Sequence, residues 1–116
     1  MFATTSLDGL VCIYIIPNKL FSIIKNKNNS YFDRIYLSSN PFPTIITFDN
    51  KNRKLSSYSL SGLLIKEKKI KGKGITLKPI FNIYGGAEID RIKVFNESYE
   101  FYTIYNLPFF DEVKFE

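Results

Sequence analysis

The segment from Ser38 to Ile70 constrains the fold more than any other, because it predicts consecutive strands joined by short turns. Thr44–Phe48 is an apolar run with the β-branched residues that favour strands. The residues of Asp49–Asn52 hydrogen-bond their own backbone and tolerate left-handed conformations, so we expect a turn there. Leu55–Leu60 alternates between the two faces of a second strand, and Ser61-Gly62 is a connection of the kind that closes hairpins.

A third strand of this segment begins at Leu63 and becomes charged after Ile65. An apolar inner strand, a mixed middle strand and a charged outer strand form the pattern of one blade of a β-propeller. A weak internal repeat supports this interpretation, since three segments align as strand, turn and strand: CIYIIPNKLFSIIK, SSYSLSGLLIKEKK and IKVFNESYEFYTIY. The alignment places Tyr14 on Tyr58 and Tyr58 on Val94, separations of 44 and 36 residues, against a blade period of about 40–45 residues.

The rest of the chain predicts more strands and no helix, since no segment keeps the i, i+3, i+4, i+7 spacing of an amphipathic helix. Leu10–Ile16 is almost continuously apolar, which predicts burial on both faces. The other expected strands cover residues 2–6, 20–25, 31–39, 80–84, 91–96 and 99–105, and a further strand could begin at residue 111. We therefore expect an all-β fold of antiparallel four-stranded blades. This partial β-propeller would be one domain, residues 1–116, with between two and three blades at about residues 1–30, 31–74 and 75–110.

The composition of the 116-residue chain is that of a globular domain, with 45% hydrophobic and 23% charged residues. Its 11 Phe and 8 Tyr favour strands. The single cysteine, Cys12, excludes an intramolecular disulfide, and we expect a buried thiol in a reducing compartment. No signal peptide is visible, and no apolar run approaches the ~20 residues of a membrane-spanning helix. We expect a cytoplasmic protein, with peripheral association with endomembranes as a further expectation.

The inventory of reactive side chains argues against an enzyme. The absence of histidine excludes Ser-His-Asp and Cys-His catalysis, and one cysteine cannot build an all-thiolate zinc site. Gly72-Lys73-Gly74 lacks the glycine spacing of a phosphate-binding loop. Asp111 and Glu112 are adjacent, so on a strand their carboxylates would point to opposite faces. We therefore expect no catalytic residue, no cofactor and no metal.

The strongest surface feature is a basic stretch near the middle of the chain. Its candidate interaction residues are Lys66, Lys68, Lys69, Lys71 and Lys73. The simpler interpretation is a solvated outer strand and loop, where lysines also block edge-to-edge pairing. The functional interpretation is a surface for an acidic protein, phosphoinositide head groups or RNA. The aromatic residues needed for stacking on single-stranded nucleic acid are absent from this stretch, and the aromatic strand Tyr99–Tyr105 is expected to be a propeller strand with Phe101 inward and its tyrosines partly exposed.

The run SSNPFPTIITFDNKNRKLSSYSLSGLLI, Ser38–Ile65, resembles the C-terminal WD-repeat propeller of BEACH-domain proteins of the neurobeachin type. In that family a similar Ser-Ser-x-Pro-x-Pro run leads into an apolar strand, and a Ser-Tyr-Ser-x-x-Gly segment leads out. The preceding sequence resembles the blade before it, with Leu7-Asp8-Gly9 matching the Leu-Asp-Gly turn of the family. Phe81–Gly86 resembles the start of the next blade. The resemblance covers roughly the first three quarters of the chain.

The resemblance implies a non-catalytic scaffold that mediates protein–protein interaction in vesicle trafficking, membrane dynamics and autophagy. The implied partners are other proteins and, through the parent protein, a membrane surface, whereas nucleic acid is not expected. The BEACH domain is absent, and a seven-bladed propeller needs about 280–300 residues. We therefore expect a fragment whose unpaired edges lead to self-association.

A second hypothesis remains open at this stage. The chain could be a self-contained small β-domain, a sandwich or a barrel, that binds nucleic acid or anionic lipid through Lys66–Lys73. Flanking coding sequence distinguishes the two hypotheses. A BEACH domain upstream and further blades downstream would favour the first, and a stop after Glu116 with no upstream reading frame would favour the second.

Overall fold

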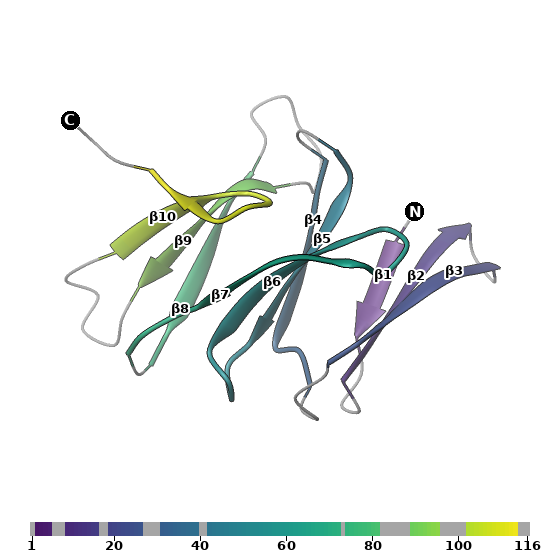
Figure 1. Cartoon of the computed structure of the whole chain (residues 1–116), viewed down its shortest axis with the longest axis horizontal. Helices are drawn as coiled ribbons and strands as arrows, with labels where there is room; N and C mark the ends of the chain where they lie inside the picture. The colour runs from purple at the N-terminus through teal and green to yellow at the C-terminus, as the bar shows by residue number, and fades with distance from the viewer. Residues whose placement is uncertain are drawn as a thin grey trace.

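The computed structural model describes residues 2–5, 9–16, 19–26, 31–39, 42–72, 74–81, 89–95 and 102–113. All regular secondary structure in these ranges is β-strand, arranged in three antiparallel sheets that follow one another along the chain (Figure 1). The prediction of an all-β fold of antiparallel, blade-like sheets is confirmed: two sheets have four strands and one has three.

Each sheet is built from consecutive strands joined as hairpins. The first sheet has the order β1-β2-β3, from β1 (Phe2–Thr5), β2 (Leu10–Ile16) and β3 (Lys19–Lys25). The middle sheet has the order β4-β5-β6-β7, from β4 (Arg34–Ser38), β5 (Thr44–Asp49), β6 (Lys54–Ser59) and β7 (Leu64–Lys69). The third sheet has the order β11-β10-β9-β8, from β8 (Thr76–Phe81), β9 (Ile89–Phe95), β10 (Tyr102–Asn106) and β11 (Asp111–Glu112).

The start of the third sheet differs from the prediction. Its first strand, β8, begins at Thr76 and includes Pro79, whereas the sequence predicted a strand at residues 80–84. Proline cannot donate to a β-ladder, but β8 is the outermost strand of its sheet, where one side of the strand makes no ladder hydrogen bonds. Residues 82–84 lie outside the described part of the chain.

The middle sheet is buried on both faces because it lies between the other two (Figure 1). Every residue of β5 is buried, and successive side chains along a strand point to opposite faces. One face packs on the first sheet in a cluster of buried residues: Val11, Ile13, Ile24, Phe32, Ile45 and Tyr58. The other face packs on the third sheet in a larger cluster: Ile46, Phe48, Leu55, Ile70, Ile89, Ile92, Val94, Tyr105, Leu107 and Phe110.

The predicted burial of β2 on both faces is wrong on its outer side. Val11 and Ile13, which face the middle sheet, have no exposed surface. Leu10 and Cys12, on the opposite face, are only partly buried, and Ile23, the cross-strand partner of Cys12, is 50% exposed. The expected burial of the Cys12 thiol is therefore also wrong. The outer face of the first sheet is apolar but incompletely covered.

The first two sheets repeat each other with the spacing of 44 residues that the sequence predicted. β2 and β6 occupy equivalent places, and each changes register immediately before its tyrosine, between Ile13 and Tyr14 and between Ser57 and Tyr58. A shift of register of this kind is a β-bulge or a similar irregularity. The irregularity recurs at the aligned positions, and β2 has a second one between Tyr14 and Ile16.

The turns before these strands also repeat at the same spacing. Gly9 and Arg53 both have positive φ, 81° and 54°. The carbonyl oxygen of Gly9 accepts a hydrogen bond of 2.8 Å from the N–H of Asn26, and that of Arg53 accepts one of 2.8 Å from the N–H of Ile70. Asn26 and Ile70 each follow the last strand of their sheet. In both sheets, the same backbone hydrogen bond therefore joins the two ends of the last hairpin.

The alignment of the third repeat is wrong. Val94 lies on β9, the second strand of the third sheet, whereas Tyr58 lies on the third strand of the middle sheet. The counterpart of β6 in the third sheet is β10. The sequence alignment matched segments that share the pattern of an apolar strand, a turn and a second strand. Every hairpin of a sheet can have this pattern, so the pattern does not show which hairpin a segment forms.

Two buried polar contacts fix the middle sheet against its neighbours. The side-chain amide of Asn26, directly after the first sheet, donates to Asp49 Oδ2 over 2.9 Å. On the opposite side the Ser57 hydroxyl donates to the carbonyl oxygen of Pro108 over 2.7 Å. Asp49 is 3% exposed and Ser57 is fully buried, so neither group can turn to water. These contacts provide the directional component that apolar packing lacks.

The Asp49 carboxylate also closes the predicted turn between β5 and β6. Oδ1 accepts a hydrogen bond of 3.2 Å from the backbone N–H of Asn52, and Oδ2 accepts one of 2.7 Å from the Asn52 side-chain amide. A buried carboxylate is costly without such donors. The turn prediction at Asp49–Asn52 is confirmed, and Asn26 supplies a donor that no local pattern indicated.

Replacing Ile46 by Ala tests the packing of the middle sheet on the third. We expect the free energy of unfolding to fall by roughly 2–5 kcal/mol, because a fully buried side chain would leave a cavity. Urea unfolding followed by circular dichroism measures this change. Leu63→Ala is the control: Leu63 is 69% exposed, and its loss should change stability by no more than about 0.5 kcal/mol. Equal effects of the two substitutions would contradict the layered core.

A double-mutant cycle on Asn26 and Asp49 tests the link between the first and middle sheets. We expect Asn26→Ala and Asp49→Ala each to destabilise the chain, and to couple by about 0.5–3 kcal/mol because they remove the same contact. Urea unfolding of the single and double variants gives this value. The matched cycle pairs Asn26→Ala with Asp111→Ala, an exposed residue of β11, and should show additive changes. Additivity in the first cycle would argue against the link.

Candidate functional site

A groove of about 400 Å³ lies between the outer strand of the middle sheet and the third sheet. The middle sheet contributes the lysines Lys68, Lys69 and Lys71, and the third sheet contributes the aromatic residues Phe95, Tyr102 and Tyr105. Further lining residues are Ile70, Ile75, Val94, Thr103 and Glu112. The groove therefore combines basic, aromatic and aliphatic surface with one carboxylate.

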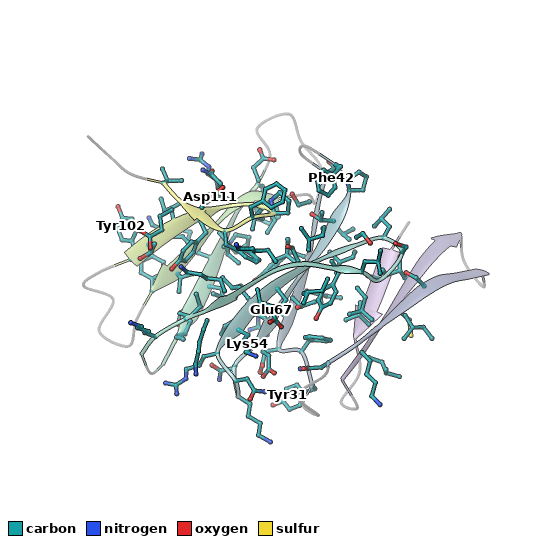
Figure 2. All side chains as sticks on the ribbon, in the orientation of Figure 1. Tyr31, Phe42, Lys54, Glu67, Tyr102 and Asp111 are labelled. Carbon is teal, nitrogen blue, oxygen red and sulfur yellow. The ribbon has the colours of Figure 1, made fainter. Side chains whose placement is uncertain are left out.

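The alternation of β7 explains where the predicted basic residues point. Lys68 pairs across the sheet with Leu55 and shares its face with Ile70, and both Leu55 and Ile70 belong to the core shared with the third sheet. Glu67 faces the other way, beside Ser56 on β6. Figure 2 shows Glu67 on the middle sheet and Tyr102 on the third sheet.

The structure does not gather all five predicted lysines into one site. Lys68, Lys69 and Lys71 line the groove, whereas Lys66 is exposed on β7 outside it. Lys73 lies outside the described residues. The basic component of the candidate site is therefore three lysines at the end of β7 and directly after it.

Lysine side chains lie over the aromatic rings of the groove. The Nζ atom of Lys68 is 5.9 Å from the centroid of the Tyr105 ring. The Nζ atom of Lys93 is 3.9 Å from the Tyr102 centroid and 5.4 Å from the Phe95 centroid. These distances are within the range of about 6 Å for attraction between a cation and an aromatic face. Phe95 and Tyr102 are cross-strand partners whose ring centroids lie 5.7 Å apart at an angle of 54°.

Tyr105 forms part of the buried side of the groove and is 7% exposed. Burial raises the pKa of its hydroxyl above the ordinary value of 10.0 because the charged phenolate would lose hydration, and the nearby Glu112 carboxylate raises it further. A hydrogen bond with the Thr103 side chain acts in the opposite direction but is the smallest of the three effects. The Tyr105 hydroxyl is therefore protonated at neutral pH.

The basic stretch and the aromatic strand Tyr99–Tyr105 are separate features of the sequence. In the structure, residues of both line the same groove. Packing of the middle sheet on the third places β10 beside the end of β7. The partial exposure expected of the tyrosines holds for Tyr102, which is 50% exposed, but not for Tyr105. Phe101 lies outside the described residues. No local pattern shows which strands of different sheets meet, so sequence alone could not assemble the groove.

The part of the chain that the structure describes contains no group of three or more His, Cys, Asp or Glu residues placed to hold a metal ion. Within the same ranges, no helix has the length and apolar character needed to cross a membrane.

Comparisons with models of known protein families, with curated proteins and with solved structures each find no match to this chain.

The raised pKa of Tyr105 predicts a loss of stability at alkaline pH. A folded-state pKa above the unfolded value of about 10 contributes stability that is fully present below pH 10 and is lost as pH rises through the folded pKa. Tyr105→Phe should therefore make the fall in unfolding free energy above pH 10 less steep. It should not abolish the fall, because burial raises the pKa values of Tyr36 and Tyr58 as well. Urea unfolding at a series of pH values measures the slope.

Every other side chain is the same in the two proteins, so the difference between their slopes isolates Tyr105. Identical slopes for the two proteins would show that Tyr105 is not held protonated by the folded structure. A steeper fall in the Phe variant would contradict the sign of the argument.

Proposed function

We propose that this chain is part of a WD-repeat propeller of the BEACH type and acts as a non-catalytic scaffold for protein–protein interaction. The proposed setting is vesicle trafficking and membrane dynamics, in the cytoplasm and at the surface of endomembranes. The main support is the relation between the first and middle sheets. They repeat at 44 residues, with a register shift before the aligned tyrosine and a residue of positive φ at the equivalent turn position, as copies of one blade would.

The burial of the middle sheet on both faces gives further support. A blade inside a propeller has a neighbour on each side, and β5 is likewise buried along its whole length between the first and third sheets. The outer face of the first sheet, with Leu10, Cys12 and Ile23, is apolar and suits the packing of another blade. Self-association of the isolated chain through such a face stays a prediction.

The chemistry of the groove supports binding in place of catalysis. An acid or base that works near neutral pH needs a pKa near 7. The pKa of Tyr105 is instead moved upward from 10.0, away from neutrality. The lysines that line the groove offer positive charge to a ligand, and Ile70, Ile75 and Val94 offer apolar surface. Surfaces of this kind recognise a partner by charge and shape.

A second candidate function is binding of nucleic acid or anionic lipid through the basic stretch. The observation that favours it is the meeting of Lys68, Lys69 and Lys71 with aromatic rings in one groove. Positive charge beside aromatic side chains is the combination that binds single-stranded nucleic acid. In this hypothesis the sheets form a self-contained β-domain and the groove is its ligand site.

Proximity labelling in the cells from which the chain comes tests the proposed function. A labelling enzyme fused to the chain should biotinylate proteins of vesicle coats and endomembranes. The Ile46→Asp variant is the control, because a buried unpaired charge at this fully buried position should unfold the core. Enrichment of RNA-binding proteins instead would favour the second candidate. The same labelled set for the unfolded control would refute the trafficking proposal.

A further inference from the structure

Strand β7 is an edge of the middle sheet. The sheet order ends at β7, and among the described strands only β6 pairs with it. No residue of β7 is buried, which distinguishes this strand from β5 and β6 of the same sheet. An edge strand presents unpaired N–H and C=O groups along one side, and an extended peptide can pair with them.

The charges of this edge select against a second copy of the chain. Lys66, Lys68, Lys69 and Lys71 lie within six residues, with Glu67 between them. Each copy brings four lysines and one glutamate in these six residues, so pairing two β7 strands would bring an excess of like charge together, which is destabilising. An acidic strand would instead place carboxylates opposite the lysines. The positive charge that disfavours pairing of two β7 strands is thus complementary to the charge of an acidic partner.

The groove at the end of β7 adds an apolar contact for the same partner. Lys68 and Lys69 of β7 line it together with Ile70, Ile75 and Val94. Side chains of an added strand would alternate between two directions. Lys66 and Lys68 pair with Ser57 and Leu55 and share the face of the groove, whereas Lys69 pairs with Lys54 on the opposite face. One set of the peptide side chains would therefore meet Lys66 and Lys68, and an apolar member of the same set, at the end of the strand, would enter the groove.

The aromatic rings of the groove favour a peptide over a single-stranded nucleic acid. A base stacks on an open ring face. Tyr105 is buried with the Lys68 ammonium over its ring, and the Lys93 ammonium lies 3.9 Å from the Tyr102 centroid. Phe95 is tilted by 54° relative to Tyr102, so these two rings do not form a flat platform.

We propose that an acidic peptide binds in extended conformation along the free edge of β7, as a fifth strand of the middle sheet. Its carboxylates pair with Lys66 and Lys68, which share the face of the groove, and with Lys71, which lines the groove. An apolar side chain on the same face enters the groove beside Ile70. This inference rests on the proposed scaffold function and names the chemical class of its partner.

Fluorescence anisotropy with the full chain tests the proposal. The probe is a fluorescein-labelled decapeptide in which aspartate alternates with threonine, and the last residue of the aspartate face is replaced by valine so that its side chain points to the groove. We expect Lys68→Glu/Lys71→Glu to weaken its binding by about tenfold or more, because two attractive contacts become repulsive. The matched control is Lys25→Glu/Lys51→Glu, two exposed lysines of the first sheet and of the turn after β5, with the same change in net charge. It should weaken binding by no more than about twofold.

Circular dichroism and urea unfolding establish that both double variants are folded before they are compared. Equal loss in the two variants would reduce the interaction to general charge attraction and overturn the proposed site. Retention of full affinity by Lys68→Glu/Lys71→Glu would do the same.

Two N-methylated probes test the addition of a strand. One carries methyl groups on the odd backbone amides of the decapeptide and the other on the even ones. An added edge strand uses every other amide to pair with its neighbour, so one probe should lose about tenfold or more in affinity and the other should bind. Undiminished binding of both probes would overturn strand addition.

Two further probes address other classes of partner. Tighter binding of an oligothymidylate, or of phosphatidylserine vesicles, than of the acidic decapeptide would overturn the proposal. Failure of the decapeptide with normal labelling of trafficking proteins would refute the β7 site and leave the scaffold function standing. Peptide binding without such labelling would refute the trafficking function and leave the site.

Discussion

The alternation of side chains along β5 is the constraint on which the rest of this structure depends. A strand points successive residues to opposite faces, so a strand buried along its whole length needs a layer on each side. Ile45 belongs to the core shared with the first sheet and Ile46 to the core shared with the third. Removing either layer would return apolar surface to water at a cost of about 25 cal/mol per Å². The three-layer arrangement follows from one strand of six residues.

Apolar faces do not by themselves determine how two sheets are oriented, since the hydrophobic effect has no direction. The buried polar contacts of the middle sheet supply that information. Asp49 accepts a hydrogen bond from Asn26 beside the first sheet, and Ser57 donates one to Pro108 beside the third. A buried polar group without its partner is costly, so alternative stackings that separate these pairs are disfavoured. Shared burial holds the layers together, and these contacts select one arrangement of them.

Local features of the sequence predicted much of the fold. The β-branched run of β5, the turn at Asp49–Asn52 and the copy of Tyr14 at Tyr58 each depend on residues close together in the chain. The wrong predictions concern features that depend on residues far apart in the chain. Pro79 is acceptable in β8 because that strand is an edge, and Val94 was assigned to the wrong hairpin because its apolar pattern fits either. The groove could not be predicted, because it forms where faces of two sheets distant in the chain meet, and local sequence patterns do not show which faces meet.

The nearest-neighbour stacking of the sheets also has a consequence for how the chain folds and diversifies. Each sheet is a continuous stretch of chain, and each core joins sheets that follow one another in sequence. Strand pairing therefore joins neighbouring segments of the chain, which favours nucleation within one sheet and propagation to the next. A unit of this kind can be duplicated or lost during evolution with changes confined to its two interfaces. The 44-residue spacing between the first and middle sheets is the trace that such a duplication would leave.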